Sequence, residues 1–234
     1  MNQTDGQPLR PTQFAENRLI TAILTESLPV GSALPNERDL ARQLGVTRPT
    51  LRETLQRLAR EGWITIRHGK PTLVNDYWNQ GGLGMLATMS RYAEQIPDGF
   101  ITNLLEVRLT ILPVCARGAA EHAAARLMEH LREAPEPRAD AGTFVRFDWR
   151  LQELFVRECR NRVYPLILND FEQIYKRLAA GYFSLEIARE SSGDYYRGLL
   201  AALPDDLDRV ETVVRDVMKK SIEIWLNLQP SPAL

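Results

Sequence analysis

Arginines and threonines that could contact nucleic acid gather between Asn36 and Lys70. This stretch holds eight basic and four acidic residues, a local charge of +4 in a chain whose formal net charge is −1. Arg48 and Arg52 are one helical turn apart in a helix, and a guanidinium can pair with guanine or hold a phosphate. A locally basic module on a near-neutral chain indicates binding to double-stranded DNA. On charge alone, a solvated helix face is the open alternative.

Two helices joined by a tight turn are predicted to position these side chains. Asn36 is suited to cap a helix over residues 37–44. Thr47 is suited to cap a second helix over residues 48–60. Pro49 falls in the first turn of that second helix, where a missing N–H costs no hydrogen bond, so it marks where the helix begins.

A β-hairpin is predicted directly after these helices. Residues 63–66 alternate as in a half-buried strand, residues 68–71 have turn composition, and residues 72–74 can return as the partner strand. The tip carries His68 and Lys70, which can donate hydrogen bonds. Helix, turn, helix and hairpin together predict a winged helix-turn-helix.

The known geometry of helix-turn-helix proteins assigns roles to these residues. The N-terminal residues of the second helix face base edges, and helix starts with flanking basic groups hold phosphates. Arg48 and Arg52 are therefore predicted to read bases. Thr47 and Thr50 are suited to phosphate contacts, and Arg38 could converge on the same groove. Because one recognition helix covers only a half-site, a dimer is expected.

The fold class predicted for the chain is mainly α, with the winged helix-turn-helix followed by an all-α helical bundle. The 234 residues suit two ordinary domains. We predict four segments: a disordered N-terminus over 1–12, the DNA-binding domain over 13–76, a linker over 77–84 and the helical domain over 85–234.

About seven helices are predicted in the C-terminal part of the chain. Pro113 is expected to kink or split one of them, and Asp205 is expected to cap the last. The predicted helices are 83–92, 98–125, 125–133, 139–159, 165–183, 185–203 and 205–228.

Covalent or metal chemistry has little support in the sequence. The only histidines are His68, His122 and His130, and no catalytic motif is present. Cys115 and Cys159 are expected to be buried free thiols in a reducing cytosol. No long apolar run or signal segment occurs, so we expect a cytoplasmic protein with no membrane partner. We expect no catalysis, metal or cofactor, although an enzyme with an accessory winged helix remains an alternative because the second domain is large.

The chain also resembles a known family. LPNERDLARQLGVTRPTLRETLQRLAREGWITIRHGKP is similar to the N-terminal domain of GntR-superfamily regulators. GLGML, NLLEVRLTI, YPLILNDFEQIYKRLAAGYF and SIEIW extend a resemblance to the fatty acid metabolism regulators of that superfamily over nearly the whole chain. The resemblance implies a homodimer that binds a palindromic operator, represses fatty acid degradation genes, activates unsaturated fatty acid synthesis genes and is released by long-chain acyl-CoA, an effector rather than a cofactor.

The family's DNA contacts carry over to matching residues of this chain. Pro49 departs from the pattern, because the family has there a hydroxyl residue that touches phosphate, so one backbone contact is expected to be lost. The base-reading arginines are intact. The matching positions are Arg38, Thr47, Arg48, Thr50, Arg52, His68, Gly69 and Lys70.

The effector side of the resemblance is less uniform. Met218 and Ile222 stand where the family has glycines, and Lys220 replaces an acidic residue. The two large side chains could fill the pocket, whereas Lys219 and Lys220 could favour the anionic CoA; an organic acid is the alternative effector. The residues that match the family's acyl-CoA pocket are Arg108, Tyr182, Ser221, Glu223 and Trp225.

Metal-binding members of the superfamily use an aspartate and three histidines in this domain. Here Asp148 matches the aspartate, but Gln152, Arg197 and Lys219 stand where the histidines would be. The resemblance therefore implies a metal-independent pocket.

Overall fold

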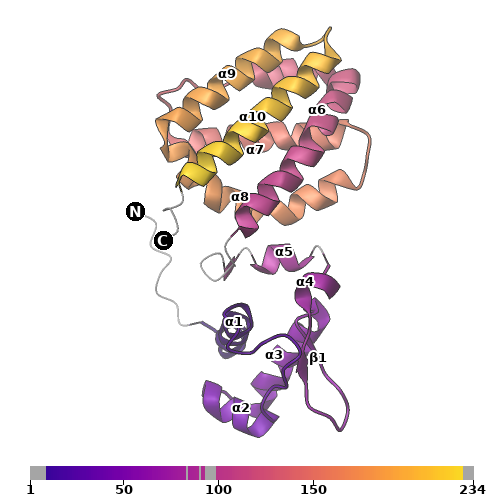
Figure 1. The fold of residues 1–234 in the computed structure, drawn as a ribbon, viewed down its shortest axis with the longest axis vertical. Helices are drawn as coiled ribbons and strands as arrows, with labels where there is room; N and C mark the ends of the chain where they lie inside the picture. Colours follow the sequence, from indigo (N-terminus) through magenta and orange to yellow (C-terminus); the bar gives the residue numbers. More distant parts are fainter. Residues whose placement is uncertain (1–8, 83, 90, 93–98, 229–234) are drawn as a thin grey trace. The chain divides into compact units, whose positions relative to one another are not determined.

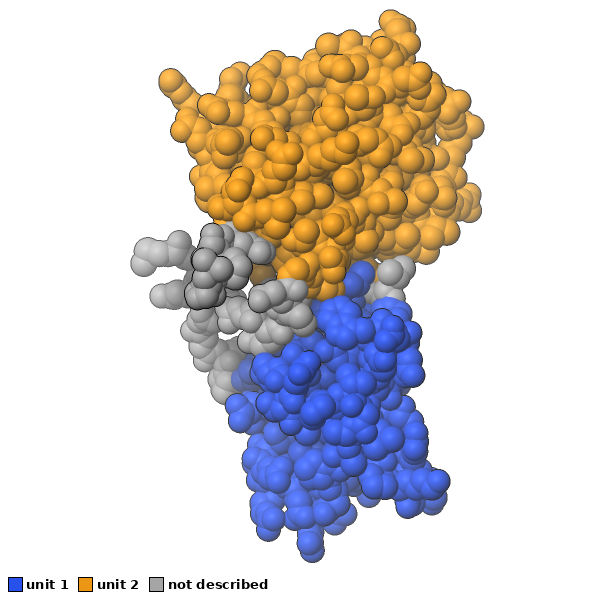
Figure 2. All heavy atoms as spheres, in the orientation of Figure 1, with its two compact units in different colours: residues 1–97 blue, residues 98–234 orange. Residues whose placement is uncertain are grey.

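The computed structural model describes residues 9–82, 84–89, 91–92 and 99–228. The chain divides into two compact units, Met1–Pro97 and Asp98–Leu234, which are coloured separately in Figure 2. In the described residues both strands belong to the first unit, and the second unit consists of helices and their connections. The mainly α architecture agrees with the prediction.

Three helices open the first unit: α1 (Pro11–Leu24), α2 (Glu37–Leu44) and α3 (Arg48–Glu61) (Figure 1). The Asn36 side chain caps α2 by accepting a hydrogen bond from the Asp39 N–H at 3.0 Å. Thr47 caps α3 in the same way, accepting from the Thr50 N–H at 3.3 Å. Between the helices, Gly45 has φ +68°, a conformation that glycine adopts without strain. Both predicted caps are confirmed.

A short antiparallel hairpin forms the wing: β1 (Ile64–Thr65) pairs with β2 (Leu73–Val74). Ala33, which precedes α2, bridges Leu73 and adds an edge that the sequence did not predict. At the tip the Lys70 N–H donates to the Arg67 carbonyl at 3.3 Å, and Gly69 has φ +69°. The tip of the wing is thus a hydrogen-bonded turn in which Gly69 has a left-handed backbone conformation.

Two further helices complete the first unit: α4 (Tyr77–Gln80) and α5 (Gly84–Met89). The segment predicted as a linker, 77–84, therefore begins with a helix, and Tyr77 is buried with its ring 5.1 Å from the Trp63 ring. Of the predicted disordered segment, residues 1–8 lie outside the described residues, whereas Pro11 and Thr12 belong to α1. The core of this unit contains Leu19, Ile20, Ile23, Leu51, Leu55, Leu58 and Trp63.

The second unit is built from α6 (Phe100–Arg132), α7 (Ala141–Glu158), α8 (Tyr164–Ser184), α9 (Glu186–Ala202) and α10 (Leu207–Leu228). Figure 1 shows these helices gathered into one bundle. Helix α7 packs against α6 and α8, and α10 packs against α6 and α9. The buried side chains of α7 include Phe144, Leu151 and Phe155, so this amphipathic helix supplies much of the core.

The seven predicted helices correspond to described elements: 83–92 contains α5 of the first unit, 98–125 and 125–133 are the two parts of α6 on either side of a kink at Ala123, and the other four are α7 to α10. Two expectations for the helical part need correction. The only non-helical backbone inside α6 is at Ala123, not at Pro113, which is buried and costs the helix a single N–H bond. Asp206, not Asp205, caps α10, because its carboxylate accepts from the Arg209 N–H at 2.8 Å.

Candidate nucleic-acid interface and helical cavity

The N-terminal end of α3 presents its side chains to solvent. Pro49 lies in the first turn of the helix, as predicted, and Arg48 and Arg52 are exposed. Thr47 is occupied locally, since its hydroxyl lies 2.8 Å from the Thr50 hydroxyl and caps the helix. The cap holds the first turn of α3 in place, and the two arginines project from it one turn apart.

Ion pairs hold two of the predicted DNA contacts while leaving them exposed. Arg52 Nε donates to a carboxylate oxygen of Glu37 on α2 at 2.7 Å, with 63% of its side chain exposed. The ion pair uses Nε, so the two terminal nitrogens of Arg52 remain available for a bidentate contact. Arg38 lies 3.8 Å from Asp39. Among the described residues no carboxylate is within ion-pairing distance of Arg48.

The wing tip supplies the remaining predicted contacts. His68, Gly69 and Lys70 are all exposed, in the turn between β1 and β2. The base of the hairpin is tied down by Asn75, which accepts from the Thr65 hydroxyl at 2.6 Å and donates to the Gly62 carbonyl at 2.8 Å. The wing is thus an exposed tip on a hydrogen-bonded base.

The second unit contains a cavity of about 110 Å³ inside the bundle. Side chains from α6, α7, α8, α9 and α10 line it, and most of the lining is apolar. Such a cavity, with an apolar wall and a few converging polar groups, is typical of a small-molecule site. Apolar lining residues include Leu104, Ile111, Phe171, Ile174, Leu178 and Val217.

One buried carboxylate organises the polar side of this cavity. Asp148, on α7, accepts hydrogen bonds from Gln152 Nε2 at 2.6 Å, from the Tyr175 hydroxyl at 2.6 Å and from the Tyr196 hydroxyl at 3.1 Å. Arg108 Nη2 lies 3.9 Å from the same carboxylate. Asp148 is therefore satisfied by partners from four helices, and Gln152 supports it as a hydrogen-bond donor.

Burial controls the ionisation of the tyrosines around this carboxylate. Desolvation, reinforced by the negative charge of Asp148, holds the pKa of Tyr175 and of Tyr196 well above the usual value. Desolvation likewise raises the pKa of Tyr182 to about 12, with Arg108 opposing it. All three tyrosines are thus neutral at physiological pH, and Tyr175 and Tyr196 donate to Asp148.

Four of the five residues predicted for the effector pocket line the cavity. These are Arg108, Tyr182, Ser221 and Trp225. Glu223 is not among the lining residues; it is exposed and accepts from Lys220 at 3.1 Å. In the described part of the chain, Arg108 Nε and Trp225 Nε1 are buried without a hydrogen-bond partner. Two residues that line the cavity therefore carry a buried donor without an acceptor.

The two large residues that depart from the family pattern lie in different places. Met218 is 2% exposed and lines the cavity. Ile222 is half-buried and is not among the lining residues. Only Met218 therefore takes up space where a ligand would bind.

The sequence prediction missed some residues that form buried hydrogen bonds or ion pairs. Arg57 on α3, for which no contact was predicted, donates to Glu16 at 2.9 Å. Tyr175 and Tyr196 around Asp148 were also missed. The one signal for the first pair was a carboxylate on the apolar face of α1, whereas the tyrosines lie 27 and 48 residues from Asp148 in the sequence and carried none.

Comparison with known proteins agrees with this architecture. Residues 11–74 match the family described as bacterial regulatory proteins of the gntR family, and residues 75–231 match the FadR C-terminal domain. A fatty acid metabolism regulator protein of Edwardsiella ictaluri is 41% identical over 221 residues, covering 94% of this chain and 92% of the relative. The chain belongs to the FadR branch of the GntR family. It is a transcription regulator by family, and its FadR-type second unit is the one that contains the cavity.

Other similar proteins fit the FadR assignment. The fatty acid metabolism regulator protein of Shewanella pealeana is 39% identical over 223 residues, with 94% of this chain and 92% of the relative covered. A solved structure of Lar, which controls the expression of the Listeria monocytogenes agr system, covers 96% of this chain and 100% of its own at a TM-score of 0.60 and 14% identity. At that identity the likeness to Lar shows the fold alone.

The described residues contain neither a helix that could span a membrane nor a cluster of side chains that could hold a metal ion. None of the helices combines the length and the apolar character that crossing a membrane requires. Among the described residues, no group of three or more histidine, cysteine, aspartate or glutamate side chains is placed to hold a metal ion.

Proposed function

We propose that this chain is a homodimeric DNA-binding regulator that represses fatty acid degradation genes and activates unsaturated fatty acid synthesis genes. Long-chain acyl-CoA is the effector that releases it from a palindromic operator. The family and the names of the relatives support the metabolic role. The exposed arginines at the start of α3 support DNA reading, in which Arg48 and Arg52 contact guanines while Thr47, Thr50 and the wing hold the backbone.

The observation that carries the effector half is the pair of unpartnered donors in an apolar cavity. Arg108 Nε and Trp225 Nε1 are buried without acceptors in the described residues, and leaving such groups unpaired costs free energy. A thioester or carboxylate oxygen would satisfy them, while the alkyl chain would lie against the aliphatic walls from α6 and α8. Acyl-CoA combines these two chemistries in one molecule.

A smaller organic acid is the second candidate effector, and the size of the cavity favours it. The cavity measures about 110 Å³, against the ~300–1,000 Å³ typical of small-molecule sites. Met218 occupies part of the space. A long acyl chain therefore requires the side chains to move apart, whereas a short acid that pairs with Arg108 does not.

The experiment has two stages. First, the full-length protein selects duplexes from a randomised pool, and fluorescence anisotropy measures its affinity for the selected operator. Second, oleoyl-CoA, octanoate and free CoA are titrated against the complex, and sedimentation gives the protein's oligomeric state on DNA. We expect a two-fold symmetric operator, a dimer, and release by oleoyl-CoA but not by free CoA.

Each result has a defined consequence. Release by octanoate alone replaces the acyl-CoA proposal with the organic-acid candidate. Binding that neither ligand weakens overturns the effector half, and a strictly monomeric protein on DNA overturns the homodimer. Trp225→Phe keeps the aromatic ring but removes the N–H, so it should weaken release without changing affinity for the operator.

A further inference from the structure

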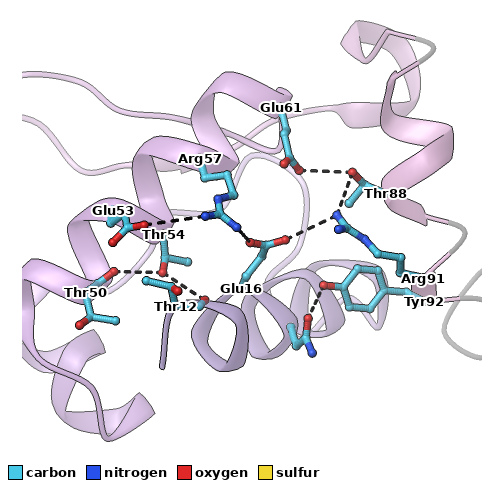
Figure 3. A network of polar contacts seen from close by, with 11 residues as sticks. Thr12, Glu16, Thr50, Glu53, Thr54, Arg57, Glu61, Thr88, Arg91 and Tyr92 are labelled. Atoms are coloured by element: carbon cyan, nitrogen blue, oxygen red, sulfur yellow. Dashed lines mark hydrogen bonds and ion pairs between the residues drawn. The ribbon is translucent and has the colours of Figure 1, made fainter. Parts of the chain in front are cut away.

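A buried carboxylate joins three segments of the first unit. Only 6% of the Glu16 side chain, on α1, is exposed. Arg57 of α3 donates to one of its oxygens at 2.9 Å, and Arg91 lies 3.5 Å from the other (Figure 3). A buried charge is costly unless it is paired, so Glu16 depends on arginines from two different segments.

The segment that carries Arg91 is held by further contacts. Arg91 Nη2 also donates to the Thr88 hydroxyl at 3.3 Å, and that hydroxyl donates to Glu61 of α3 at 3.4 Å. The Tyr92 hydroxyl donates to Asn17 of α1 at 2.7 Å. Figure 3 shows Glu61, Thr88 and Arg91 facing one another between α3 and the segment. The contacts dock the segment on both helices.

Apolar contacts reinforce this docking. Met85, Met89 and Tyr92 are buried, and Gly62 at the end of α3 faces the Met85 sulfur. We call residues 84–89 and 91–92 the docking segment. It comes last among the described residues of the first unit, and α6 begins at Phe100, a few residues farther along the chain. A change in the second unit that is carried along the chain therefore reaches the docking segment before it reaches α3.

We propose that Glu16 is a positioning residue that couples the docking segment to the recognition helix α3. In the DNA-binding state the segment is docked and Glu16 shares its charge between Arg57 and Arg91. When the segment undocks, Glu16 loses Arg91 and α3 loses the link from Thr88 to Glu61. The proposal rests on the proposed function for its effector, and it adds the residues through which the effector would act.

Reciprocity makes the coupling testable without any effector. If docking favours DNA binding, DNA binding must favour docking by the same factor. Amide hydrogen exchange in the docking segment of the full-length protein should therefore slow when the selected operator is added, by a factor within the roughly 5–150-fold range usual for coupled sites. No change in the wild-type protein would overturn the proposal.

Arg91→Gln is the decisive variant because Arg91 is 56% exposed, so its loss leaves Arg57 to pair with Glu16 and spares the fold. Arg18→Gln is the matched control: Arg18 is an exposed arginine of α1 with no ion pair in the described residues. We expect operator-dependent protection of the docking segment to disappear in Arg91→Gln and to persist in Arg18→Gln. Equal behaviour of the two variants would contradict the coupling.

The effector response gives a second, separable readout. If oleoyl-CoA weakens operator binding by the wild-type protein, that weakening should shrink at least ~5-fold in Arg91→Gln, while thermal shift shows that oleoyl-CoA still binds. An undiminished response in Arg91→Gln would count against the proposal. If oleoyl-CoA has no effect on the wild-type protein, the effector half of the proposed function fails, and the exchange measurement still decides the coupling.

Discussion

Arginines of the two units lie in opposite environments: those at the start of α3 are exposed, and Arg108 in the bundle is largely buried. On α3, Arg48 and Arg52 are exposed, and Glu37 touches only the Nε of Arg52. In the bundle, 20% of the Arg108 side chain is exposed, and it lies beside Asp148 with its Nε unpartnered in the described structure. The first environment leaves the charge in water, whereas the second has largely removed it from water.

This difference determines what each region contributes. Exposed arginines add little to the stability of the folded protein, because surface charges stay hydrated and screened. A buried polar group must be satisfied by the fold itself, and removing one partner leaves the others unpaired. Substitutions at the proposed DNA-binding surface should therefore change binding alone, while substitutions around Asp148 should change folding first.

The largest expected effect tests the buried side of the comparison. Asp148→Ala removes the acceptor shared by Tyr175, Tyr196 and Gln152 and the negative charge beside Arg108. We expect the second unit to lose about 3–5 kcal/mol of its free energy of unfolding. Urea unfolding followed by tryptophan fluorescence measures this loss.

Two control variants sharpen that result. Asp148→Asn keeps the shape and one acceptor oxygen, so it should cost less than Asp148→Ala. Asp194, which pairs with Arg197 at the surface, is 76% exposed, so Asp194→Ala should cost at most ~1 kcal/mol. Equal losses of unfolding free energy in Asp148→Ala and Asp194→Ala would show that burial does not determine how much a charged side chain contributes to stability.

The next effect tests the exposed side. Arg48→Ala or Arg52→Ala should weaken binding to the selected operator by about 1–3 kcal/mol and relax the base preference, with little change in stability. Arg60→Ala, at the far end of the same helix, is the control and should preserve base preference. Anisotropy titrations with selected and scrambled duplexes make the comparison. If both duplexes lose affinity equally, the arginines hold phosphates and do not read bases.

The two regions also differ in how well the sequence predicted them. The winged helix-turn-helix depends on caps and a proline close together in the chain, so Asn36, Thr47 and Pro49 were enough to place the starts of α2 and α3. Such signals act over a few residues and do not depend on the rest of the fold. The bridge from Ala33 to β2 was missed because it joins distant residues.

Local signals in the sequence were not enough to predict the residues of the cavity. Family resemblance pointed to Arg108, Tyr182, Ser221 and Trp225, which do line the cavity. The tyrosines that bond Asp148 come from α8 and α9, and the helical pattern predicts which face is apolar but not which polar atoms meet. Pro113 misled the prediction of where α6 bends, since its backbone is helical and the kink lies at Ala123.

A smaller effect tests how Glu37 modifies the exposed arginines. Glu37→Gln removes a negative charge near the DNA face and frees Arg52, so affinity for scrambled duplex should rise. Arg52 also loses the partner that fixes its orientation, so the ratio of operator to scrambled affinity should fall, by about 0.2–1 kcal/mol for an exposed pair. Glu53→Gln makes the same charge change on α3 without touching Arg52 and should leave the ratio unchanged.

The smallest effect concerns pH and returns to the buried unit. Desolvation lowers the pKa of His130 from its usual value of 6.5, although its hydrogen bond with the Phe147 carbonyl at 3.1 Å opposes the shift. Below pH 6.5 the unfolded chain therefore binds more protons at this site than the folded protein does, so stability falls as pH decreases. The stability that the lowered pKa of His130 contributes is fully present above pH 6.5.

His130→Gln retains a hydrogen-bond donor for the Phe147 carbonyl but cannot titrate, so the gap in unfolding free energy between the wild-type protein and this variant should narrow as the pH drops from 7.5 to about 5. His68→Gln, on the exposed wing, is the control, and the second unit should unfold with the wild-type pH dependence. The comparison cancels the titration of carboxylates, which all three proteins share. A gap that stays constant with pH would mean that burial does not set the protonation of His130, and the contrast between exposed and buried cationic side chains would then hold for the arginines alone.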